Sequence, residues 1–60
     1  MQLPQDDFIL LSFINTKLRD EYSVLADLCE DLGAEEENIR TRLARLGYEY
    51  DENVNSFVRR

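Results

Sequence analysis

The chain has 60 residues, with 13 acidic and 7 basic side chains and a net charge of −6. This length allows one small domain, residues 1–60, which buries only about 60% of the surface of its unfolded chain. The acidic balance opposes indiscriminate binding to nucleic acids and to anionic membranes.

Cys29 is the single cysteine and there is no histidine, which excludes an internal disulfide and a histidine-ligated zinc site. We expect no cofactor and no metal. The start, MQLPQDDF, carries acids where an export signal carries basic residues, and the longest apolar run, residues 8–14, is too short to cross a bilayer. These features predict a cytoplasmic protein that does not bind membranes.

A first helix is predicted over residues 7–19, with Asp6 as its N-cap. Its apolar residues recur at helical spacing, but they are too numerous for one face. The helix therefore either lies at the centre of the domain or makes a second contact. The predicted core positions are Phe8, Leu11, Ile14 and Leu18, and the additional apolar residues are Ile9, Leu10 and Phe13.

Two more helices are predicted over residues 24–32 and 35–46, joined by a tight turn at Gly33. Ser23 is the expected N-cap of the first, and Gly33 and Gly47 are the expected helix stops. Three glutamates at the start of the second helix and arginines further along match the helix dipole. The predicted core positions are Leu25, Leu28, Leu32, Ile39, Leu43 and Leu46.

Residues 48–58 change character, because Tyr48 and Tyr50 alternate with Glu49 as in a strand. A turn at 51–53 and a return strand ending near Val58 would complete a β-hairpin, with Phe57 covering one end of the core. The alternative is a fourth short helix capped by Asp51, with Val54, Phe57 and Val58 facing inward. The predicted fold is mainly α, with three helices followed by a short C-terminal β-hairpin.

Two resemblances follow from these residues. Cys29, Gly33, Ile39 and Leu43 stand at the small, turn and apolar positions of a helix-turn-helix. Residues 23–47 therefore resemble that motif, and the tail 48–58 resembles the wing of a winged-helix domain. The segments LPQDDFILLSFINTKLRDEY and LGYEYDENVNSF resemble a family of short bacterial proteins known only as a domain of unknown function, although that pattern has a proline at the position of Asp7. This resemblance implies a small stand-alone cytoplasmic protein and supplies no activity.

The arginines of the third helix are the first functional hypothesis. On a recognition helix, Arg40, Arg42 and Arg45 could contact phosphates or base edges. The alternative is that they are solvated residues that balance the acids at 35–37, and Glu36 is spaced to pair with Arg40. Those acids also oppose DNA binding, because they occupy the first turn of the same helix.

The acids at 35–37, together with Asp27, Glu30 and Asp31, could dock a basic partner, although a solvated acidic face explains them more simply. Residues 51–55 resemble the start of a calcium loop. Ser56 replaces its glycine and the final acidic ligand would fall beyond Arg60, which excludes the site.

No catalytic group is indicated, because Ser12 and Cys29 have no histidine to activate them. We predict a protein that is not an enzyme. Instead, it is expected to be a helix-turn-helix-like interaction module that binds protein and self-associates as a homodimer. DNA binding in transcriptional regulation, through residues 35–46 and the hairpin, is the alternative. The candidate self-association residues are Ile9, Phe13, Tyr48 and Tyr50.

Overall fold

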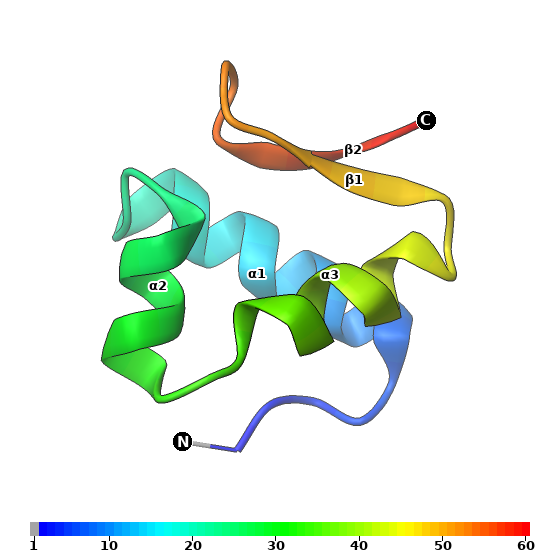
Figure 1. Cartoon of the computed structure of the whole chain (residues 1–60), viewed down its shortest axis with the longest axis horizontal. Coiled ribbons are helices and arrows are strands. Elements are labelled where there is room, and N and C mark those ends of the chain that lie inside the picture. Colours follow the sequence, from blue (N-terminus) through cyan, green and yellow to red (C-terminus); the bar gives the residue numbers. More distant parts are fainter. Residues whose placement is uncertain (1) are drawn as a thin grey trace.

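The computed structural model describes residues 2–60 and confirms the predicted element order. Helix α1 spans Asp7–Asp20, α2 spans Leu25–Leu32 and α3 spans Glu36–Ala44. Strands β1 (Tyr48–Asp51) and β2 (Ser56–Arg59) form an antiparallel hairpin that lies along one side of the helices (Figure 1). The alternative of a fourth helix is therefore wrong.

The α1 N-terminus forms as predicted. The Asp6 side chain accepts hydrogen bonds from the backbone N–H groups of Phe8 and Ile9, at 2.8 and 3.1 Å. These groups have no partner inside the helix, so the cap satisfies two of the four orphan donors.

Gly33 ends α2 in the left-handed conformation, with φ of 65°. The α3 helix ends at Ala44, two residues earlier than expected, and a turn leads through Gly47, whose φ is 83°. Both positive φ values lie in the region where glycine carries no steric penalty. They turn the chain sharply enough for α3 to pack against α2 and for β1 to return along α3.

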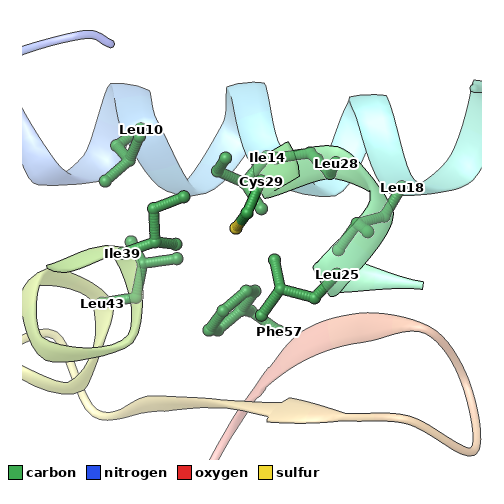
Figure 2. Close-up of a cluster of buried hydrophobic side chains, with 9 residues drawn as sticks. All are labelled: Leu10, Ile14, Leu18, Leu25, Leu28, Cys29, Ile39, Leu43 and Phe57. Atoms are coloured by element: carbon green, nitrogen blue, oxygen red, sulfur yellow. The ribbon is translucent and has the colours of Figure 1, made fainter. Parts of the chain in front are cut away.

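The core lies between the helices and the hairpin (Figure 2). Side chains of α1 point from one side toward Phe57 of β2, and α2 and α3 close the flanks. The buried residues are Leu10, Ile14, Leu18, Leu25, Leu28, Cys29, Ile39, Leu43 and Phe57.

The predicted core needs one clear correction on α1. Leu10 is fully buried, whereas the side chain of Phe8 is 65% exposed. Both residues fit a helical stripe that includes Ile14 and Leu18, so periodicity alone did not decide which flank of α1 meets the other helices. Three other expected core residues are only partly buried and pack around the core: Leu11, Leu32 and Leu46.

The start of α2 also differs from expectation. Its N-cap is Val24, which makes no side-chain cap, and Ser23 is exposed. The backbone N–H of Leu25 instead donates to the hydroxyl of Tyr50 at 3.2 Å. A residue of the hairpin therefore supplies the oxygen that a local cap would have supplied.

Candidate interaction surface

Three polar side chains fasten the hairpin to the helices, and we call Asn15, Tyr50 and Asn55 the hairpin clasp. Asn15 of α1 bonds twice to the backbone of Phe57: its Nδ2 donates to the Phe57 carbonyl at 3.1 Å, and its Oδ1 accepts from the Phe57 N–H at 2.8 Å. A single amide side chain thus satisfies both polar groups of a buried strand residue.

Asn55, in the hairpin turn, holds the end of α1. Its Nδ2 donates to the carbonyls of Leu18 and Tyr22, at 3.0 and 2.8 Å. Its Oδ1 accepts from the Tyr50 hydroxyl at 2.6 Å, and this hydroxyl is also the cap of α2. Asn55 has a positive φ of 49°, which asparagine tolerates better than most residues. The clasp therefore joins the end of α1, the start of α2 and the hairpin turn.

The arginines of α3 and its C-cap residue, Arg45, project to two different sides. Arg42 is largely buried and donates to Asp7 Oδ1 at 2.7 Å and to the carbonyls of Pro4 and Gln5, at 2.7 and 2.8 Å. It therefore ties the N-terminal segment to α3. Arg45 remains 67% exposed, with its Nη1 3.9 Å from the second oxygen of Asp7.

Arg40 lies on the opposite side of α3, toward β1. It pairs with Glu36 at 2.8 Å, as the spacing predicts, and its guanidinium carbon lies 5.5 Å from the centre of the Tyr50 ring. The three arginines do not form a continuous basic stripe, because Arg40 is separated from Arg42 and Arg45 and because two of the three have close acidic partners.

The four candidate self-association residues lie on two elements. Tyr48 and Tyr50 are half-buried on β1, and the Tyr50 hydroxyl belongs to the hairpin clasp. Phe13 is half-buried beneath Lys17, whose Nζ lies 5.7 Å from the ring centre. Asn15 faces the hairpin, and Phe13, two residues away, projects from nearly the opposite flank of α1. The structure does not bring the two pairs together.

The most exposed apolar side chains on α1 are the candidate Ile9, at 60%, and Phe8, which was not a candidate, at 65%. Ser12 and Thr16 follow them at helical spacing and are also exposed. We call Phe8, Ile9, Ser12 and Thr16 the outer α1 face. The sequence signalled Ile9 as surplus apolar surface but assigned Phe8 to the core.

A groove adjoins the outer α1 face, between α1 and the hairpin turn. Ser12, Asn15 and Thr16 line its helical side, and Val54 and Asn55 line the other. Val54 is itself 61% exposed. Large apolar side chains at one end of α1 and an open groove at the other end thus lie on one surface.

Two titratable side chains of the helices and their connections have pKa values raised by their surroundings. Burial raises the pKa of the Cys29 thiol, and Glu36 raises it further, so the reactive thiolate is disfavoured. A hydrogen bond to Asp31 raises the pKa of Tyr22 to about 12. Within residues 2–60, no three metal-ligating side chains gather in one place, and no helix is long and apolar enough to cross a membrane.

The fold and this surface define a small, mainly α domain with a hairpin fastened across its helices. Residues 4–57 match the family model described as Domain of unknown function (DUF4250), so the chain belongs to this family. The family resemblance drawn from the sequence is confirmed. The search of curated proteins and the search of solved structures found no match.

Proposed function

We propose that this protein is a non-enzymatic interaction module of the cytoplasm that binds a second copy of itself through the outer α1 face. The observation that carries the proposal is the exposure of Phe8 and Ile9, at 65% and 60%, in the first turn of α1. Adjacent large apolar residues on an ordered helix are typical of contact surfaces.

Two-fold symmetry makes this surface complementary to itself. If two α1 helices pack antiparallel with the axis beside Ser12, residue 8 of one copy lies opposite residue 16 of the other. Phe8 would then enter the partner's groove beside Thr16 and Val54. The large Phe8 side chain of one copy would thus meet the smaller Thr16 of the other. The small Ser12 side chains at the axis would allow the two helices to approach closely.

The expected dimer is weak. Burial of one Phe or Ile side chain contributes about 1.5–3 kcal/mol, and association costs about 4–15 kcal/mol. Each copy also carries a net charge of −6, so the two copies repel. Salt screens this repulsion and should therefore strengthen the dimer.

Sedimentation velocity over a range of protein concentrations tests the proposal at low and high salt. The parent should show a concentration-dependent dimer that salt strengthens, and Ile9→Glu should remain a monomer. Val24→Glu is the matched control, because Val24 is 43% exposed and also lies at a helix N-terminus. Both changes place an acid where the helix dipole favours it, so folding should persist. A parent that is monomeric at every concentration and salt would refute self-association.

DNA binding through α3 and the hairpin is the second candidate, supported by the exposed guanidinium of Arg45 at the end of α3. The internal contacts of Arg42 and the pairing of Arg40 oppose it. Fluorescence anisotropy with random-sequence duplex at about 50 and 200 mM salt separates the candidates, because phosphate contacts weaken as salt rises. Binding that is lost at the higher salt and weakened by Arg45→Ala would favour DNA.

A further inference from the structure

The two edges of the hairpin differ. On the β2 edge, the N–H and C=O of Phe57 are bonded to the Asn15 side chain, so they point away from β1. Phe57 lies opposite Tyr50, and the two form a non-hydrogen-bonded pair of the antiparallel ladder. In a pair of this kind, the backbone groups of both residues point away from the partner strand. The N–H and C=O of Tyr50 therefore point out from the β1 edge.

Backbone N–H and C=O groups alternate between the two edges of a strand, so those of Tyr48, two residues before Tyr50, also point out from the β1 edge. The residue before Tyr48 supports this orientation, because the carbonyl of Gly47 points toward β2 and accepts from the N–H of Arg60 at 2.8 Å. The backbone groups of Gly47 and Glu49 thus face β2, and those of Tyr48 and Tyr50 face outward. No turn, loop or side-chain hydrogen bond within residues 2–60 reaches the outward backbone groups of these two tyrosines. The β2 edge is therefore closed at Phe57, whereas the β1 edge is open at Tyr48 and Tyr50.

A groove runs beside the open edge. Its helical side is formed by Arg40 and Ala44 of α3, and its strand side by Tyr48, Glu49 and Tyr50 of β1. Phe57 of β2 and the neighbouring Arg60 also reach it, so the groove extends from the β1 edge across the hairpin. Ala44 is exposed and small, which leaves room for a polypeptide beside the strand. An extended chain in this groove could form backbone hydrogen bonds with Tyr48 and Tyr50, as in other complexes formed by strand addition.

We propose that the β1 edge binds an extended segment of another protein as a third strand. The charge on β1 selects the chemistry of that segment. The Glu49 carboxylate is 68% exposed, and its nearest base, Arg60, lies 3.8 Å away and bonds more closely to Asp51, at 2.9 Å. A Lys or Arg opposite Glu49 is therefore favoured, and the alternate residues, which face Ala44, should be apolar.

A second copy of β1 does not fit this description. The two antiparallel registers that pair most of β1 with itself place Glu49 opposite either Glu49 or Asp51 of the other copy. Like charges directly opposite each other destabilise a strand pair. The site is thus separate from the self-association through the outer α1 face, and it accepts a different partner.

The first test is amide hydrogen exchange of the whole chain, measured for individual residues by NMR. The amides of Tyr48 and Tyr50 should exchange faster than those of Glu49 and Val58, whose N–H groups face the partner strand. Equal protection of all four amides would show that the β1 edge is not open and would overturn the proposal.

The second test adds a probe peptide, acetyl-Thr-Lys-Val-Lys-Val-Lys-Thr-amide, to the ¹⁵N-labelled protein. It should shift the Tyr48 and Tyr50 amide signals, and a peptide with Glu in place of Lys should bind about 3- to 5-fold more weakly, given the usual size of cross-strand charge pairs. In Glu49→Lys, the order of the two peptides should reverse. Equal binding of both peptides, shifts confined to other residues, or no shifts at millimolar peptide would each overturn the proposal.

Discussion

The two sides of α1 use their residues in different ways. On the side that faces the hairpin, Asn15 bonds to both backbone groups of Phe57, and Asn55 from the turn bonds to the carbonyl of Leu18 in the last turn of the helix. On the outward side, Ile9 remains in water and is 60% exposed. The hairpin side thus stabilises the fold, and the outward side carries surface that the fold does not need. Adjacent residues of one helix thus differ in burial, since Leu10 is fully buried and Ile9 is 60% exposed.

The difference between the two sides predicts opposite effects of substitution at two neighbouring residues of α1. Leu10→Ala removes a fully buried side chain and should lower the free energy of unfolding by about 2–5 kcal/mol. Ile9→Ala, at a position 60% exposed, should change it by less than about 0.5 kcal/mol. Urea unfolding followed by circular dichroism measures both. A similar loss in the two variants would mean that the outward side also supports the fold.

The hairpin clasp provides the next largest effect. Asn55→Ala removes two donated hydrogen bonds and the acceptor of Tyr50. At about 0.5–1.5 kcal/mol for each bond, the loss should be about 1.5–4.5 kcal/mol. Asn55→Gly separates the loss of the hydrogen bonds from backbone strain at the positive φ. Glycine adopts this φ without strain but cannot form the side-chain bonds. If Asn55→Gly were as stable as the parent, the bonds of Asn55 would not hold the hairpin.

Tyr50→Phe is a smaller change to the same clasp. The ring, which packs 5.5 Å from that of Phe57, is kept, and only the hydroxyl that caps α2 is lost. We expect a loss of about 1–2 kcal/mol. Tyr48→Phe is the control, since it removes a hydroxyl outside the clasp. Equal unfolding midpoints for the two variants would show that α2 does not depend on a cap from the hairpin.

The smallest predicted effect is a dependence on alkaline pH. The bond to Asp31 raises the pKa of Tyr22 from 10.0 to about 12, so the folded state favours the neutral phenol. The resulting stability is fully present below pH 10 and is lost as the pH rises toward 12. Unfolding measured between these pH values should show the decrease, and Tyr22→Phe should reduce it. An unchanged pH profile in that variant would contradict the assignment.

Local signals were sufficient for the elements of this fold. The Asp6 cap, the stop at Gly33 and the alternation of Tyr48, Glu49 and Tyr50 each depend on neighbouring residues, and the structure confirms what they predicted. The position of Phe8 could not be predicted in the same way. Apolar residues project from several sides of α1, and only the packing of α2 and α3 decides which side is buried.

The long-range contacts were also beyond the sequence pattern. Arg42 bonds to Asp7, 35 residues away, and Asn55 bonds to Leu18, 37 residues away. Neither pair has a spacing that a helix or hairpin would bring together. Arg42 was therefore interpreted as a residue of the α3 surface, and the clasp was not anticipated. The positive φ of Asn55 suggests why an asparagine serves there, but this value is known only from the structure.

Disulfide cross-linking at Ser12 tests the central claim, that the outer α1 face joins two copies, most directly. Ser12 is exposed and lies beside the proposed two-fold axis, so Ser12→Cys should place two thiols opposite each other. Mild oxidation should give a covalent dimer faster than in Asn53→Cys, an exposed control in the hairpin turn, and faster than in the parent, whose Cys29 is buried. Equal rates of cross-linking at positions 12 and 53 would contradict the claim.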